Sequence, residues 1–234
     1  METNMKDQSL AMPIAIVVGA ALVAAAVYFS GMAHPTTPRA QNPQPTATAD
    51  VSKVKTDGEP FIGSVTAPVT IAYWFDYQCP FCKQNELESI AQLKKDYVDT
   101  GKVRIVFKDF AFLGPDSQTL AQWARAVWAY APDKYYDWHH AIFADQGTEN
   151  TGWATAAEIA KVTTSVLGQA GEAAVAQLVK QNGANYQRAI DADKAEGASM
   201  GITGTPGMIV GKQLVVGAVP YAQVKSAIDA QLKK

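Results

Sequence analysis

The stretch "VTIAYWFDYQCPFC", residues 69–82, contains the only two cysteines of the 234-residue chain. Its first part, residues 69–77, has apolar or aromatic side chains on both alternating faces, which is typical of a central strand covered on both sides. Proline suits the first position of a helix, because the amide hydrogen that it lacks would be unpaired there. Pro80 therefore predicts that a helix begins directly after Cys79 and makes Cys79 its N-cap residue.

An N-cap cysteine lies where the free amides of the first turn and the positive end of the helix dipole stabilise negative charge. The sequence therefore predicts a lowered pKa for Cys79 and identifies this residue as the nucleophile. Cys82 follows three residues later, nearly one helical turn, so its sulfur is expected on the same side of the helix, within disulfide reach but deeper. We expect Cys82 to be the resolving thiol.

A metal site and a pair of inert structural cysteines are the other two interpretations of this spacing. A metal site needs about four ligands. The chain has no second cysteine pair, and His139 and His140 are adjacent and far along the chain. Inert structural cysteines are not expected at C-x-x-C spacing between a strand and a helix. We therefore expect no metal and no cofactor, and we interpret both histidines as packing or surface residues.

The residues after the cysteines predict a helix and then a second strand. Apolar residues recur at spacings of three and four through residues 83–98, which indicates an amphipathic helix that ends near Gly101. Residues 103–110, "VRIVFKDF", are typical of a strand. The apolar face of the helix is expected to consist of Leu87, Ile90, Leu93 and Tyr97.

A helical region and a hairpin complete the pattern. Apolar residues repeat at helical spacing over about 116–200, so we expect an all-helical insertion into the strand, helix, strand unit. The sheet resumes over 208–216, where Gly211 begins a two-residue turn, and a closing helix is expected over 221–232. Pro206 precedes the first hairpin strand, a position where a sheet tolerates proline.

The N-terminal region predicts a membrane anchor and a spacer. Residues 10–33 are apolar and without charged side chains, long enough to span a bilayer, so we interpret them as an uncleaved transmembrane signal anchor after a short tail, residues 1–9. Residues 34–58 are rich in proline and threonine, which favours an extended linker that holds the folded part off the membrane. The folded domain is expected over 59–234.

Charge and composition exclude some other classes of protein. The formal net charge is -2 and the basic residues are scattered, so the sequence has no basic stripe for nucleic-acid binding. No segment repeats at a fixed period, which excludes a repeat array. No dimerisation module is visible, and we expect a monomer.

Four segments in this order resemble the DsbA family of thioredoxin-like disulfide oxidoreductases: "APVTIAYWFDYQCPFC", "VRIVFKDFAF", "YYDWHHAIF" and "GITGTPGMIVGKQLVVGA". The resemblance covers residue 61 to the C-terminus and implies an α/β thioredoxin-like fold with an all-helical insertion. It also implies that Pro206 is cis and faces Cys79, and that the backbone of Thr205 pairs with an extended substrate strand. The family works outside the cytoplasm, where disulfides persist.

Two positions depart from the family pattern. Relatives often carry a buried acid six residues before the nucleophile, where this chain has Tyr73. Proton transfer from Cys82 would then rely on water or on Asp76, although Asp76 is equally interpreted as a solvated residue at the strand end. Phe81 stands where strong oxidants of the family have histidine, which predicts a milder oxidant.

The sequence thus predicts a membrane-anchored thiol:disulfide oxidoreductase with its catalytic domain on the extracytoplasmic side. It would introduce disulfide bonds into exported proteins by exchange at Cys79 and Cys82, and a membrane redox partner would reoxidise it. A reductase or isomerase of the same fold is one alternative. A membrane-tethered peptide-binding or chaperone module with an incidental dithiol is another, and full cellular activity of a Cys79→Ser protein would favour it.

Overall fold

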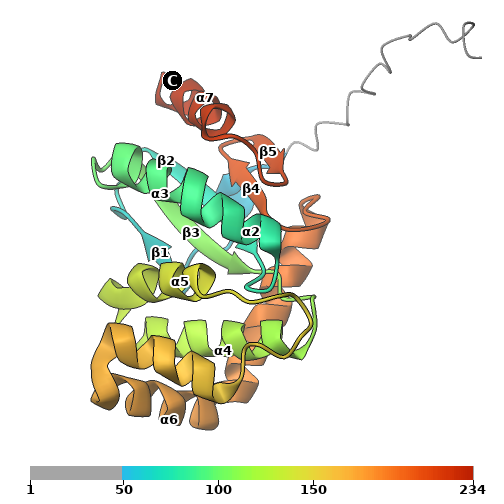
Figure 1. Ribbon diagram of the computed structural model, residues 1–234. Helices are drawn as coiled ribbons and strands as arrows, with labels where there is room; N and C mark the ends of the chain where they lie inside the picture. The colour runs from blue at the N-terminus through green and yellow to red at the C-terminus, as the bar shows by residue number, and fades with distance from the viewer. Residues whose placement is uncertain (1–48, 234) are drawn as a thin grey trace, which may run out of the picture. The chain divides into compact units, whose positions relative to one another are not determined.

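The computed structural model describes residues 49–233, which build a five-stranded sheet in the order β1-β3-β2-β4-β5 (Figure 1). Strand β2 lies at its centre, parallel to β3 and antiparallel to β4, and Ile71 of β2 pairs with Ile105 and with Val210. The central strand expected before the cysteines is therefore confirmed. The strands are β1 (Phe61–Ile62), β2 (Val69–Phe75), β3 (Val103–Asp109), β4 (Gly207–Val210) and β5 (Gln213–Val216).

A continuous helical run begins directly after Cys79 and packs, with the C-terminal helix, on one face of the sheet. Two of its segments are π-helical, so their turns are wider than those of an α-helix. The prediction that Leu87 faces inward is wrong: Leu87 is exposed, and the buried face carries the polar residues Asn85 and Glu86 instead. The helical segments are α2 (Pro80–Asn85), η2 (Glu86–Ile90), α3 (Ala91–Leu93), η3 (Lys94–Val98) and α7 (Tyr221–Leu232).

The residues between β3 and β4 contain helices and no strand, which confirms the all-helical insertion (Figure 1). Gly168 has φ +73° and divides the longest helix into two. The second of these continues to Ser199, and buried side chains such as Ile190 hold it against the domain. The insertion consists of α4 (Pro115–Tyr130), the 3-10 helix η4 (Pro132–Lys134), α5 (Tyr135–Ala144) and α6 (Ala156–Ser199).

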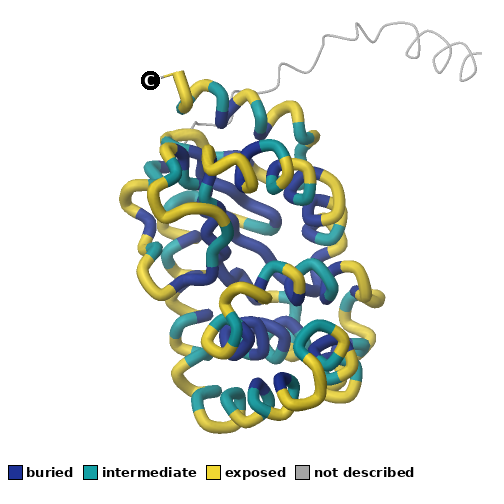
Figure 2. Tube along the Cα trace, turned by 90° about the vertical axis from the view of Figure 1, so that its left-hand side faces the viewer, coloured by how far each residue is buried: buried dark blue, intermediate teal, exposed yellow. Residues whose placement is uncertain are grey.

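The two faces of β2 bury different partners, and Figure 2 shows the buried residues gathered through the middle of the domain. Tyr73 and Phe75 point into the large core that the cysteines share, whereas Trp74 belongs to a smaller core on the other face. The indole nitrogen of Trp74 donates to the backbone oxygen of Asp193, 2.9 Å away. A Cβ atom at Gly197 would lie only 2.7 Å from the same indole. Helix α6 thus packs closely against the sheet.

A buried cluster of charges joins the insertion to the sheet. Lys108 of β3 lies 2.5 Å from Asp193 of α6, and Arg125 of α4 lies 2.7 Å from Asp109 of β3. Burial, followed by the nearby charge of Asp109, raises the pKa of Asp193 to about 7, although Arg125 opposes this shift. The other two carboxylates of the cluster are Glu59 and Glu196.

The last part of the expected linker is packed against the domain. Ala49 and Val54 are buried, and the amide of Val51, in the 3-10 helix η1 (Val51–Lys53), donates to the backbone oxygen of Gly211 over 2.8 Å. The sequence missed this because only scattered small apolar residues of the segment contact the core. The predicted tail, the predicted transmembrane anchor and the linker up to residue 48 lie outside the described residues. None of the helices between residues 49 and 233 is long and apolar enough to cross a membrane.

Candidate active site

Cys79 is the N-cap residue of α2 and Pro80 occupies the first turn, as the sequence predicts. Strand β2 ends at Phe75, so Cys79 lies close to the end of the central strand. The backbone oxygen of Cys79 accepts hydrogen bonds from the amides of Cys82 and Lys83, at 3.0 and 3.1 Å. Both cysteines are free, and the structure therefore shows the dithiol form of the pair.

The two thiols of the pair differ in their acidity. A hydrogen bond from Cys82 is the largest cause that lowers the pKa of Cys79, to about 6, and Thr205 adds to it while burial opposes it. Burial raises the pKa of Cys82 well above its ordinary value, and the hydrogen bond to Cys79 raises it further. At neutral pH Cys79 therefore carries the negative charge and Cys82 the proton, a distribution suited to nucleophilic attack by Cys79.

Thr205 and Pro206 lie beside the dithiol, although the sequence separates them from it by the whole insertion. The peptide bond between them is cis. The backbone oxygen of Thr205 lies 3.4 Å from the Cys79 sulfur and accepts a hydrogen bond from it when Cys79 is a thiol. On the far side the backbone oxygen of Pro206 accepts from the amide of Gly217 over 2.8 Å. The cis bond that the family resemblance implied is therefore confirmed, and the loop contacts the nucleophile.

Asp76 is buried, so its interpretation as a solvated strand-end residue is wrong. Its carboxylate accepts hydrogen bonds from the hydroxyl of Ser117, at 2.6 Å, and from the amide of Phe112, at 2.8 Å. Two further amides, those of Gln78 and Leu113, also donate to it. Because these contacts join the start of the active-site loop to the start of α4, Asp76 organises the backbone around the dithiol.

Gln146 is a site residue that the sequence did not reveal. Its side-chain amide donates to the backbone oxygens of Tyr77 and Cys79, over 2.6 and 3.1 Å. The Nζ of Lys83 donates in turn to the backbone oxygen of Gln146 over 3.0 Å. These bonds tie the loop after α5 to the turn that holds the nucleophile. A single glutamine in a loop has no pattern by which sequence reasoning could have found it.

Glu86 and His139 are fully buried next to each other. The carboxylate and the Nε2 of His139 are 3.3 Å apart, and the Nδ1 of His139 lies 2.8 Å from the hydroxyl of Tyr77. Burial alone would raise the pKa of Glu86, but the charge of His139 and the hydrogen bonds of both histidines lower it to about 2. His139 is therefore a packing residue, as expected, whereas His140 is partly exposed.

Pro80 and Phe81, between the cysteines, are exposed, and 61% of Phe81 is accessible to solvent. Phe112, which follows β3, is a second exposed aromatic residue, and its amide is bound by Asp76. Among residues 49–233 no group of three or more His, Cys, Asp or Glu side chains is arranged to hold a metal ion.

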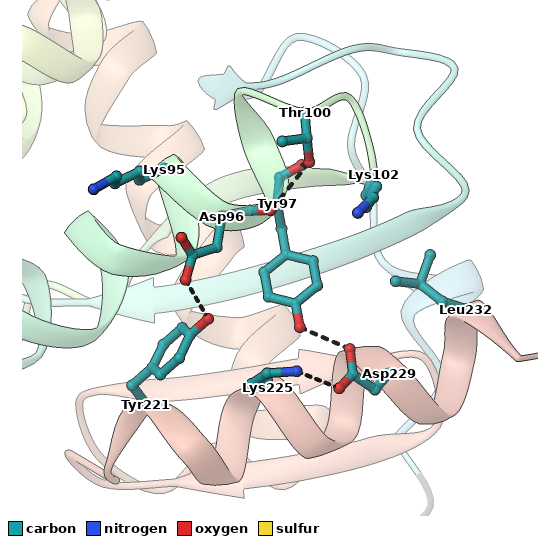
Figure 3. Close-up of a pocket in the computed structure, with 9 residues that line it drawn as sticks. All are labelled: Lys95, Asp96, Tyr97, Thr100, Lys102, Tyr221, Lys225, Asp229 and Leu232. Carbon is teal, nitrogen blue, oxygen red and sulfur yellow. Dashed lines mark hydrogen bonds and ion pairs between the residues drawn. The ribbon is translucent and has the colours of Figure 1, made fainter.

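A hollow of about 700 Å³ lies away from the cysteines, between η3 and α7 (Figure 3). Its polar groups are engaged with one another. Tyr97 donates to Asp229 over 2.7 Å, Lys225 pairs with the same carboxylate at 2.6 Å, and Tyr221 donates to Asp96 over 2.6 Å. These contacts fasten α7 to η3, and we assign this hollow no catalytic role.

Comparisons with known proteins agree with the geometry. A family model described as thioredoxin matches residues 55–230. Disulfide bond formation protein D of Bacillus subtilis (strain 168) is 29% identical over 179 residues, 75% of this chain and 78% of that protein. The crystal structure of oxidised BdbD from Bacillus subtilis matches with a TM-score of 0.70 and 26% identity, over 81% of this chain and 98% of that one. The thiol-disulfide exchange protein alpha-DsbA2 from Wolbachia pipientis matches with a TM-score of 0.65 and 26% identity, over 74% and 86% of the two chains.

Proposed function

Since this chain belongs to the thioredoxin family and is a thiol:disulfide oxidoreductase of the DsbA type, we propose that it introduces disulfide bonds into exported proteins. The observation that carries the direction is the opposite shift of the two pKa values, lowered for Cys79 and raised for Cys82. A stabilised Cys79 thiolate favours the reduced enzyme, and this makes the enzyme disulfide a good donor to other thiols.

The proposed cycle has two exchanges of thiol for disulfide. A substrate thiolate attacks the Cys79 sulfur of the oxidised enzyme, which forms a mixed disulfide and leaves the electron pair of the broken bond on Cys82. A second substrate thiolate then attacks the substrate sulfur of the mixed disulfide and releases Cys79 as a thiolate. The substrate leaves oxidised by two electrons, and a membrane redox partner removes those electrons from the reduced enzyme.

The substrate is proposed to bind across the exposed surface around Cys79. Phe81 and Phe112 offer apolar area to an unfolded chain, and Thr205 is only partly buried. An extended substrate segment beside the backbone of Thr205 would add to the loop as a strand. Such contacts do not select for a particular substrate sequence, which suits an enzyme that acts on many exported proteins. The enzyme is proposed to act as a monomer.

The extracytoplasmic location and the membrane anchor are part of the proposal. The apolar run of residues 10–33 supports an anchor, and the proline-rich residues that follow it support a spacer. Newly made disulfides persist only outside the reducing cytoplasm. This topology is tested with two variants, one with a cysteine added at residue 4 and one with a cysteine added at residue 230. Intact cells are treated with an alkylating reagent that cannot cross the membrane. Labelling at residue 230 alone is expected, and labelling at neither position would contradict it.

The activity is tested by mixing the oxidised protein with a reduced, unfolded substrate that regains enzymatic activity only when its disulfides form. The enzymatic activity that the substrate regains is expected to rise in proportion to the amount of substrate oxidised. Both Cys79→Ser and Cys82→Ser should abolish this recovery. Unchanged recovery with Cys79→Ser would contradict the proposal and favour a chaperone. Recovery only from a scrambled, already oxidised substrate would favour an isomerase.

A further inference from the structure

The backbone turn that leads from β2 into α2, residues 76–79, must keep one conformation for Cys79 to act as an N-cap residue. Cys79 has φ -72° and ψ 117°, the extended conformation typical of an N-cap. The hydrogen bond from the Cys82 thiol is the largest cause that lowers the pKa of Cys79, and the backbone amides of Cys82 and Phe81 lower it further. Rotation of the peptides in the turn would move the sulfur away from these donors.

Two carbonyl oxygens of this turn accept hydrogen bonds from one side chain in the loop that follows α5. The side-chain amide of Gln146 donates to the backbone oxygen of Tyr77 over 2.6 Å and to that of Cys79 over 3.1 Å. The Cys79 oxygen also accepts from the amides of Cys82 and Lys83, at 3.0 and 3.1 Å. This oxygen is therefore held by two amides of the helix and by one side chain from outside it.

The two bonds from Gln146 lie in the interior, where they are costly to lose. Gln146, Tyr77 and Cys79 are all buried. A buried backbone oxygen that loses its donor has little access to water as a replacement, so its peptide is expected to rotate toward another partner. The side chain of Gln146 therefore fixes the orientation of two peptides, the one after Tyr77 and the one after Cys79.

The position of Gln146 is itself fixed on both sides. Its backbone oxygen accepts a hydrogen bond from the Nζ of Lys83, on α2, over 3.0 Å. The next residue, Gly147, packs so closely on Trp153 that an added Cβ atom would lie 2.8 Å from the indole ring. The side-chain amide of Gln146 thus has little freedom to follow a turn that moves.

Gln78, the residue before the nucleophile, is held by the same loop and by the start of α4. The amide of Asn150 donates to the side-chain oxygen of Gln78 over 2.9 Å. The side-chain nitrogen of Gln78 donates to the backbone oxygen of Leu113 over 2.8 Å and to the hydroxyl of Ser117 over 3.1 Å. All these partners belong to the segment between β3 and β4. The helical insertion therefore supplies the contacts that shape the turn.

We propose that Gln146 is a positioning residue for the nucleophile, whose side-chain amide holds the peptides of Tyr77 and Cys79 so that the Cys79 sulfur stays at the N-cap. This inference rests on the proposed exchange function. Gln146 acts through the backbone of Cys79 and takes no part in the transfer of electrons. Through this contact the helical insertion controls how readily Cys79 forms a thiolate.

This role is tested with Gln146→Met, which keeps the length of the side chain and removes its donor, and with Gln146→Glu, which places an acceptor where the donor was. Gln122→Met is the matched control, because it removes a glutamine amide that donates to Gln187 over 2.9 Å, between α4 and α6. The reduced protein is alkylated with iodoacetamide between pH 5 and pH 9, and the rate at Cys79 gives its pKa. Thermal unfolding of each variant is measured in parallel.

In Gln146→Met the pKa of Cys79, about 6 in the unmodified protein, is expected to rise by about one unit, so that alkylation at pH 5 slows about tenfold. The rates should converge near pH 9, where both proteins carry the thiolate. Gln146→Glu is expected to raise the pKa at least as far, because its carboxylate faces two carbonyl oxygens. Gln122→Met is expected to leave the pKa of Cys79 unchanged.

A pH profile of Gln146→Met that overlays that of the unmodified protein would overturn the proposal. A lowered melting temperature with that unchanged profile would show that Gln146 has a structural role alone. If Gln146→Met does not fold, Gln146→Glu decides by the same comparison. Alkylation needs no disulfide partner, so the two claims are separable. The expected shift in Gln146→Met, together with an unmodified protein that fails to oxidise a reduced substrate, would overturn the proposed function alone.

Discussion

The sulfur of Cys79 lies 3.4 Å from the backbone oxygen of Thr205, 126 residues further along the chain. The hydroxyl of Thr205 is buried at the same place and contributes to the lowered pKa of Cys79. The loop before Pro206 therefore contacts the nucleophile in two ways, since its backbone oxygen accepts a hydrogen bond from the Cys79 thiol and its side chain stabilises the thiolate.

Replacing Thr205 with valine is expected to raise the pKa of Cys79, because valine keeps the shape of the side chain and removes the hydroxyl that stabilises the thiolate. Thiolate absorbance near 240 nm as a function of pH measures this shift. The control is Thr70→Val, in the part of β2 remote from the dithiol. A titration of Thr205→Val that overlays that of the unmodified protein would show that the hydroxyl has no influence on Cys79.

The reduced protein is expected to gain stability relative to the oxidised protein as pH rises from 5 to 8. The pKa of Cys79 in the folded protein, about 6, lies below its ordinary value of 9.0. The stabilisation is therefore lost as pH falls through 6 and grows by about 1.4 kcal/mol per pH unit between the two values. The oxidised protein lacks this thiol and serves as the reference.

Urea unfolding of both forms at pH 5 and at pH 8 measures that difference, which should shift by roughly 2 to 3 kcal/mol toward the reduced form. The acidity of Cys82 does not interfere, because its pKa is raised well above the ordinary value and its thiol stays neutral throughout this range. An identical difference at the two pH values would contradict a depressed pKa for Cys79.

Gly197→Ala and Gly183→Ala are expected to have opposite effects, although both glycines lie in α6. A Cβ atom at Gly197 would lie 2.7 Å from the indole of Trp74, so the helix must shift, at a cost of about 1 to 3 kcal/mol. At Gly183 the nearest atom is 3.5 Å away, and alanine should stabilise the helix by up to about 1 kcal/mol. Thermal unfolding of the two variants measures both effects. Equal changes in thermal stability for the two variants would show that α6 does not pack closely against Trp74.

Arg125→Met is expected to destabilise the protein by about 3 to 5 kcal/mol, because it leaves buried carboxylates without their partner. Lys161→Met removes an exposed pair with Glu158, 3.5 Å apart, and should change stability by less than about 1 kcal/mol. Denaturant unfolding gives both values. A loss from Arg125→Met no larger than that from Lys161→Met would mean that the cluster does not hold the insertion to the sheet.

Local patterns in the sequence predicted the parts of the site that local chemistry determines. The apolar strand and the proline after Cys79 predict the strand, the start of the helix and the order of the two thiols, because N-capping depends on neighbouring residues. The contact between Cys79 and Thr205 spans the whole insertion, and only the family resemblance implied it. No periodicity in either segment contains that information.

Burial of polar residues was the main feature that the sequence did not reveal. Asp76 was interpreted as solvated, since the loop amides that bind it come from more than 30 residues away. The helix after Cys82 was assigned an apolar face that included Leu87, whereas Asn85 and Glu86 occupy the buried positions. The buried carboxylate of Glu86 lies 3.3 Å from the Nε2 of His139 in α5, a partner that no local pattern identifies.

The reduction potential of the Cys79–Cys82 pair tests the central claim most directly. The purified protein would be equilibrated in glutathione buffers of defined ratio and the fraction of free thiols read by alkylation. With a Cys79 thiolate stabilised at neutral pH, the account predicts a disulfide that forms reversibly, with a potential well above the value of about -270 mV typical of thioredoxin and toward the value of about -120 mV of a strong oxidant. A potential at or below about -270 mV would contradict the proposed role as a donor of disulfides, and failure to form a disulfide in any buffer would contradict the redox function itself.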